Sequence, residues 1–86
     1  MITSAQIRAA RALLGIDQRA LADRAGLSVP TIQRMEAAAG QVGGTVDSLV
    51  KVVAALEGLG VELIRDGDPS SGGGRGVRLR DAGPPG

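Results

Sequence analysis

The side chains best suited to chemistry in this sequence lie close together, between Val29 and Arg34. The Gln33 amide can pair with adenine, and the Arg34 guanidinium can donate to O6 and N7 of guanine together. Val29 and Pro30 have no side-chain donor, so they can sense only thymine methyl groups. On one exposed helix face these four residues would be able to read the base edges of DNA. The alternative is that Gln33 and Arg34 belong to an ordinary solvated surface.

Two short helices would position this segment. Asp17 predicts the N-terminus of a helix over residues 18–25. Ser28 predicts the start of the next helix, with Pro30 in its first turn, where the missing N–H does no harm. Gly26 stands between them, where a left-handed residue commonly ends a helix. Two helices joined by such a turn can place the second one in the major groove.

Three side chains and one glycine are expected to shape this helix pair without touching DNA. Ala22 is small where the two helices would cross closely. Gly26 makes the turn, and Ile32 and Met35 give the second helix its inner face. We interpret all four as core and turn positions.

Polar groups at the two helix N-termini are candidates for holding DNA phosphates, because free N–H groups and the helix dipole favour anions there. Gln18 begins the first helix of the pair, and Ser28 and Thr31 lie at the start of the second. Arg19 is a further candidate. For Arg19, a solvated surface position explains the residue nearly as well.

One more helix is expected on each side of the pair. Thr3 and Gln6 predict a capping box at the start of the first helix. Thr45 or Asp47 predicts the start of the fourth helix, which runs to about Gly58. The stripes expected to face the core are Ile7, Ala10, Leu13 and Leu14 in the first helix and Leu49, Val52, Val53 and Leu56 in the fourth.

After Gly60 the helical periodicity ends. Residues 61–64 and 77–80 alternate between apolar and polar side chains, as half-buried strands do. The segment between them is rich in glycine and serine, which predicts a flexible loop, and residues 82–86 predict a disordered tail. The sequence therefore divides into a helical domain, 1–60, and a strand pair with its loop, 61–81.

The strand pair would carry one apolar face, formed by Val61, Leu63, Val77 and Leu79. A lone two-stranded hairpin is marginal in water, so the strands must pack on the helices or pair with another copy. We expect a homodimer that uses this face. The alternative is an intramolecular hairpin folded over the fourth helix, with dimerisation through that helix or none.

The helix pair also carries the pattern of a known family. Gln18, Ala22, Gly26, Ile32, Met35 and Glu36, together with the preceding RALLGIDQ (11–18), are the residues that carry it. Over roughly residues 4–60 the sequence resembles the lambda-repressor-like (Xre/Cro-type) helix-turn-helix regulators. The resemblance implies a mainly α, compact four-helix domain, here followed by a strand pair like the dimerising sheet of some Cro-like relatives. It also implies that the segment from Val29 to Arg34 approaches the bases, although apolar Val29 and Pro30 depart from the polar residues common there.

The resemblance implies one ion pair as well. In the family an arginine near the end of the first helix often pairs with a glutamate at the end of the recognition helix, which is the third helix and the second of the pair. Arg11 and Glu36 stand at the matching positions. Such a pair would hold the third helix against the first and orient Arg11 near a phosphate. The alternative is two independent surface charges that contribute little.

Composition excludes several other functions. The 86 residues include no cysteine and no histidine, and Lys51 is the single lysine among 10 basic residues. The commonest nucleophile, general base and metal ligands are therefore missing, and an enzyme is the poorest interpretation. We expect no cofactor, no metal and no small-molecule substrate. Without a membrane-length apolar run or a signal-peptide pattern, we expect a cytoplasmic protein without membrane contact.

The interpretation favoured by the sequence is a sequence-specific regulator of transcription that binds double-stranded DNA, as a homodimer. The formal net charge of +1 supports DNA binding only weakly, so the charges must be sorted by face. The absence of aromatic residues leaves a small core, which also favours dimerisation. The alternatives are a protein-interaction adaptor and an antitoxin that binds both DNA and a protein partner.

Overall fold

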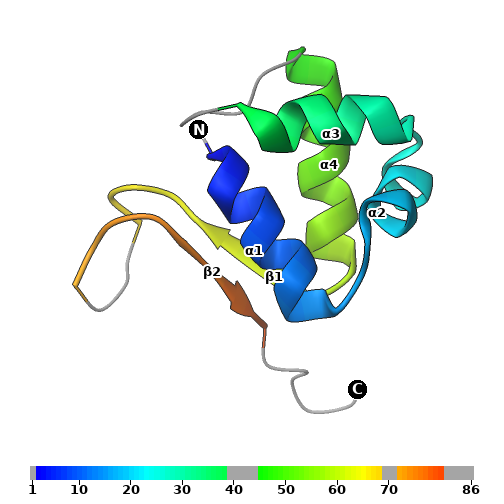
Figure 1. Ribbon diagram of the computed structural model, residues 1–86. Helices are drawn as coiled ribbons and strands as arrows, with labels where there is room; N and C mark the ends of the chain where they lie inside the picture. The colour runs from blue at the N-terminus through cyan, green and yellow to red at the C-terminus, as the bar shows by residue number, and fades with distance from the viewer. Residues whose placement is uncertain (1, 39–44, 69–71, 81–86) are drawn as a thin grey trace.

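The computed structural model describes residues 2–38, 45–68 and 72–80 of the 86-residue chain. Four helices come first and an antiparallel strand pair comes last (Figure 1). This order confirms the expected mainly α fold with a C-terminal strand pair. The elements are α1 (Ser4–Leu14), α2 (Gln18–Ala25), α3 (Val29–Ala37), α4 (Val46–Gly58), β1 (Val61–Ile64) and β2 (Gly76–Leu79).

The helix starts follow the capping residues in the sequence. The Thr3 hydroxyl accepts from the Gln6 backbone N–H, and the Gln6 side chain accepts from the Thr3 N–H, which completes the capping box of α1. Asp17 accepts from the Ala20 N–H at 2.8 Å, and Ser28 accepts from the Thr31 N–H at 3.3 Å. These bonds satisfy helix N–H groups that have no partner within their own helix.

The start of α4 had two candidates in the sequence. Thr45 is the cap, because its hydroxyl accepts from the Ser48 N–H at 3.1 Å. Asp47 lies inside the first turn, where its charge suits the helix dipole, and it pairs with Lys51 one turn later at 3.3 Å.

The core is aliphatic and is shared by the helices and the strands. Leu13 does not join it, contrary to expectation, and is 44% exposed. The buried face of α1 follows Ile7 and Ala10 and continues at Leu14, which packs against the core. Leu13 is six positions after Ile7 and so lies about 120° around the helix from it, at the edge of that face, where burial depends on the neighbouring elements. Leu49 and Val53 of α4 are only partly buried. The buried hydrophobic residues are Ile2, Ile7, Ala10, Leu21, Ala22, Ala25, Ile32, Met35, Val52, Ala55, Leu56, Val61 and Leu63.

The strands form a hairpin within the chain that packs on α1 and α4. Leu63 pairs with Val77 and Val61 pairs with Leu79. Because Ile64 pairs with Gly76, β2 begins one residue earlier than expected from the sequence. Part of the loop expected between the strands (69–71) and the expected tail (82–86) lie outside the described residues.

None of the helices described is long and apolar enough to cross a membrane.

Candidate nucleic-acid interface

Helix α3 has one buried side and one exposed side. Ile32, Met35 and Glu36 are at most 4% exposed and face the rest of the chain. On the other side, Gln33 and Arg34 are exposed. The buried side fixes the helix in place, so the exposed side is presented in a defined orientation.

The start of α3 adds both apolar and polar groups to that exposed side. Pro30 is exposed, whereas Val29 is half-buried and packs against the core. Arg34 donates to the Thr31 hydroxyl at 3.2 Å, and the same hydroxyl lies 2.9 Å from that of Ser28. These bonds hold the Arg34 guanidinium along the helix surface.

The turn between α2 and α3 depends on one small residue and one glycine. Ala22 is 1% exposed, and α2 and α3 pack against each other. Gly26 adopts φ +69°, in the left-handed region, and its N–H donates to the carbonyls of Ala22 and Asp23. The Leu27 N–H also donates to the Ala22 carbonyl, at 2.9 Å. Ala22 is therefore buried in the core, and Gly26 supplies the left-handed residue that ends α2.

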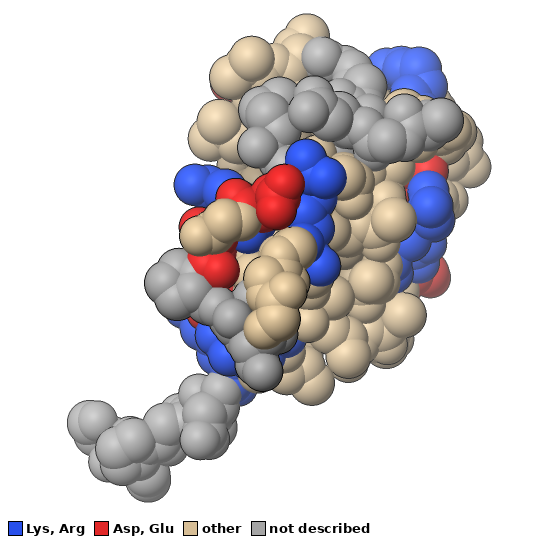
Figure 2. Space-filling model, turned by 90° about the vertical axis from the view of Figure 1, so that its left-hand side faces the viewer, with Lys and Arg blue, Asp and Glu red and all other residues tan. Residues whose placement is uncertain are grey.

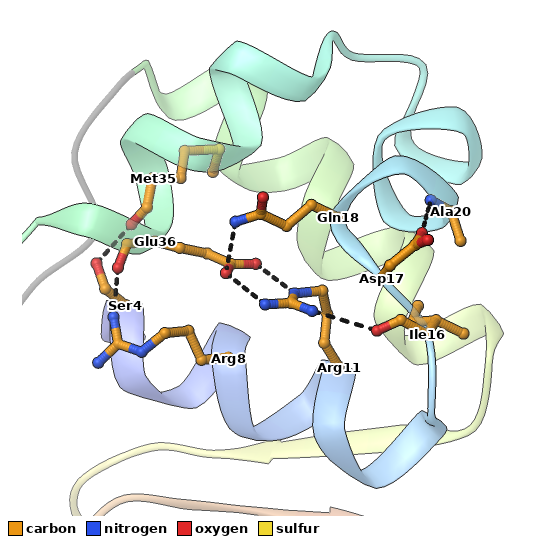
Figure 3. Close-up of polar contacts among 9 residues, drawn as sticks. All are labelled: Ser4, Arg8, Arg11, Ile16, Asp17, Gln18, Ala20, Met35 and Glu36. Atoms are coloured by element: carbon orange, nitrogen blue, oxygen red, sulfur yellow. Dashed lines mark hydrogen bonds and ion pairs between the residues drawn. The ribbon is translucent and has the colours of Figure 1, made fainter.

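The C-terminal end of α3 is held by a two-point ion pair (Figure 3). Arg11 of α1 donates through Nε to Glu36 Oε2 at 2.7 Å and through Nη2 to Glu36 Oε1 at 2.8 Å. Arg11 Nη1 donates to the Ile16 carbonyl at 3.2 Å, and Gln18 Nε2 donates to Glu36 Oε1 at 3.1 Å. This Arg11–Glu36–Gln18 cluster joins the end of α1, the start of α2 and the end of α3.

Burial and hydrogen bonding act in opposite directions on Glu36. Burial raises the pKa of its carboxyl. The hydrogen bonds from Arg11 and Gln18, together with the charges of Arg11 and Arg8, lower that pKa by more than burial raises it, so the net shift is downward. The hydrogen bond to Glu36 raises the pKa of Arg11, against the effect of burial. The cluster therefore stays charged, and the buried carboxylate is fully paired.

Two side chains of α1 satisfy backbone carbonyls at the end of α3. The Ser4 hydroxyl donates to the Met35 carbonyl at 2.5 Å, and Arg8 Nη1 donates to the Glu36 carbonyl (Figure 3). These bonds matter because Ala38, the residue that follows α3, is extended, so no left-handed residue caps the last carbonyls of the helix. Sequence reasoning did not find them, since an acceptor on the backbone leaves no residue signal.

The candidate phosphate-binding residues differ in solvent exposure and in whether their hydrogen-bond donors are already used within the protein. Arg19 and Ser28 are exposed, and Thr31 is half-buried. Gln18 and Arg11 are both half-buried and use donors within the cluster. Phosphate contacts by these five residues stay predictions.

These features together define a DNA-binding domain of the helix-turn-helix type. The comparison with protein families agrees, because the helix-turn-helix model matches residues 7–63, which is more than half of the chain. The chain therefore belongs to the Xre/lambda-repressor-like helix-turn-helix family. No match is found among curated proteins.

Proposed function

We propose that this protein regulates transcription by binding a specific sequence of double-stranded DNA, with α3 inserted into the major groove. The observation that carries the proposal is the two-sided character of α3. The inner side of the helix is buried from Ile32 to Glu36. On the outer side, Gln33 and Arg34 are exposed. A helix whose inner side is packed against the core and whose outer side carries exposed polar side chains is suited to direct reading of bases.

Within this proposal, Arg34 donates to guanine and Gln33 contacts adenine or the backbone. Val29 and Pro30 contribute only apolar contact with thymine methyl groups. With two apolar residues among the four, sequence preference would depend partly on DNA shape and deformability. A good two-point contact from Arg34 would discriminate its base pair by about 1–3 kcal/mol.

The side of the molecule that carries the hairpin has charges of both signs. Figure 2 shows basic and acidic side chains next to each other there. On the hairpin itself, Arg78 and Glu62 form an ion pair. This arrangement favours α3 and the adjoining N-terminus of α2, where Arg19 is exposed, as the surface that approaches DNA.

A dimer would place two copies of α3 about 34 Å apart, one turn of DNA, and would require a roughly palindromic site. The strand residues expected to form its interface are not equally available. Val61 and Leu63 are buried in the chain's own core and Val77 is half-buried, whereas Leu79 is 48% exposed. A dimer through the strands would therefore have to use Leu79 and the outer edge of β2.

Selection of bound duplexes from a random library tests the proposal. We expect a preferred sequence to emerge, and the affinity for it to fall steeply as salt rises, because phosphate neutralisation releases counterions. Arg34→Ala should weaken binding about 10-fold or more and relax the preference at one base pair. Arg24→Ala, at an exposed position on α2, is the matched control for loss of charge.

Two outcomes would redirect the assignment. If Arg34→Ala changes neither affinity nor preference, Arg34 is not the reading residue. If no sequence is enriched at low salt and a stoichiometric protein partner copurifies, the adaptor function is supported instead. An antitoxin would bind both DNA and such a partner.

A further inference from the structure

The Arg34 guanidinium, the proposed reader of guanine, has a hydrogen-bond partner within its own helix. Arg34 Nη2 donates to the Thr31 hydroxyl oxygen at 3.2 Å, and within the described part of the chain this is the one hydrogen bond of the Arg34 side chain. The ion pairs among the described residues do not include Arg34 either. The position of this exposed arginine therefore depends on Thr31.

The Thr31 hydroxyl is itself held by the residue that caps α3. Its oxygen lies 2.9 Å from the Ser28 hydroxyl oxygen, and the Ser28 hydroxyl also accepts from the Thr31 backbone N–H at 3.3 Å. A hydroxyl has one donor and two acceptor positions. Whichever of the two hydroxyls donates to the other, Thr31 keeps a lone pair for Arg34. Because threonine is β-branched, its side chain also has few alternative rotamers.

The bond to Thr31 leaves the guanidinium able to read a base. An arginine carries five N–H donors, and Thr31 uses one of them. The remaining four still include a parallel pair, which is what a two-point contact with O6 and N7 of guanine requires. The side chain can therefore keep its partner in the helix while it contacts DNA.

A guanidinium that is already held should discriminate between bases better than a freely moving one. Immobilising a long side chain at an interface costs roughly 2- to 10-fold in affinity. A freely moving arginine incurs this cost only on a duplex that offers guanine, so the cost reduces the preference for guanine. When the protein holds the side chain before DNA binds, most of this reduction is avoided.

We propose that Thr31 is a positioning residue for Arg34 and sets how strongly the protein prefers guanine at the base pair that Arg34 reads. The inference rests on the proposed function. It assigns Thr31 a different role from the phosphate contact expected from its place at the start of the helix. A phosphate contact would add affinity on every duplex, because phosphates carry no sequence information directly.

Equilibrium binding to two duplexes tests the proposal. The duplexes differ only at the base pair whose preference is lost in Arg34→Ala. Thr31→Val removes the hydroxyl and keeps the shape of the side chain, and it should reduce the preference for the guanine duplex roughly 2- to 10-fold. Thr31→Ser keeps the hydroxyl and is the matched control, which should retain most of the preference. In the Arg34→Ala background, Thr31→Val should change neither duplex's affinity, since no guanidinium is left to position.

The protein without DNA gives a second measurement. Nuclear magnetic relaxation of the Arg34 Nε group should show a more ordered side chain than that of Arg24, which is also exposed. Thr31→Val should bring the Arg34 side chain to the mobility of Arg24, and Thr31→Ser should not.

Three results would decide against the inference. Arg34 may not be as mobile as Arg24 in the wild type, and Thr31→Val may not weaken both duplexes equally with and without Arg34. Either result would overturn the positioning role and leave the proposed function intact. A protein that selects no DNA sequence would overturn the proposed function and this inference with it.

Discussion

Arg11 and Glu36 are 25 positions apart in the sequence, yet two nitrogens of the one meet both oxygens of the other within 2.8 Å. The Glu36 side chain is 4% exposed and that of Arg11 is 21% exposed. Because the carboxylate is buried and the guanidinium partly solvated, the pair satisfies a charge that the third helix carries into the interior. The orientation of the proposed reading helix therefore depends on a residue of the first helix.

Removal of Arg11 should destabilise the protein strongly. Arg11→Ala leaves the Glu36 carboxylate buried with only the Gln18 amide, and we expect a loss of about 3 kcal/mol in the free energy of unfolding. Arg11→Lys keeps the charge but cannot make the two-point contact, so it should recover only part of this loss. Urea unfolding measures both, with Arg24→Ala as the control for an exposed arginine. Equal stabilities of Arg11→Ala and Arg24→Ala would contradict the role of the pair.

The same pair should make stability sensitive to acid. The pKa of Glu36 is lowered in the folded protein from its ordinary value of 4.5, so the folded state favours the ionised form. The resulting stability is fully present above about pH 4.5 and is lost as the pH falls through the folded value. The difference in unfolding free energy between wild type and Glu36→Gln should therefore shrink on acidification below that pH.

Unfolding of the wild type and Glu36→Gln at a series of pH values measures this difference. Asp23→Asn removes a negative charge from an exposed position of α2 and controls for the general effect of net charge. A wild-type advantage that grows toward low pH would have the wrong sign and would refute the assignment.

The Arg11–Glu36 pair was expected from the sequence because both partners are charged side chains at positions typical of the family. The helix starts were also predictable, since Thr3, Asp17 and Ser28 each act on a backbone group three residues away. Local interactions of this kind leave a pattern in the sequence.

Other contacts could not be found in this way. Ser4 and Arg8 donate to backbone carbonyls 31 and 28 positions away, and every residue has a carbonyl. The exposure of Leu13 depends on how α1 is placed among its neighbours, which a helical period alone does not fix. Tertiary placement, not local preference, decides such positions.

Two glycines should respond in opposite ways to alanine. Gly26 has φ +69°, and a methyl group there would meet no atom within 4 Å, so Gly26→Ala should cost about 1 kcal/mol or more through the backbone alone. Gly58 lies within α4 and also has open space, but without a positive φ. Gly58→Ala should therefore stabilise the protein by about 0.4–1 kcal/mol. Thermal unfolding of the two variants gives the comparison, and a shift in the same direction for both would show that φ does not control the outcome.

Gln6 should control how firmly the hairpin is attached. Its Nε2 donates to the carbonyls of Ile64 at 2.8 Å and Gly76 at 2.9 Å, while its Oε1 accepts from the Thr3 N–H at 2.8 Å. Gln6→Glu keeps an acceptor for Thr3 but, when ionised, has no donor for the two carbonyls. Because Gln6 is 5% exposed, leaving those acceptors unsatisfied should cost about 1–3 kcal/mol.

Native-state hydrogen exchange separates this effect from global unfolding. In Gln6→Glu the backbone amides of β1 and β2 should exchange faster at neutral pH, whereas amides in the middle of α2 should keep their protection. Thr3→Ala, which removes the hydroxyl of the capping box and leaves both donors of Gln6 in place, should instead affect mainly the start of α1. Unchanged strand protection in Gln6→Glu would mean that apolar packing of Val61 and Leu63 alone holds the hairpin on the helices.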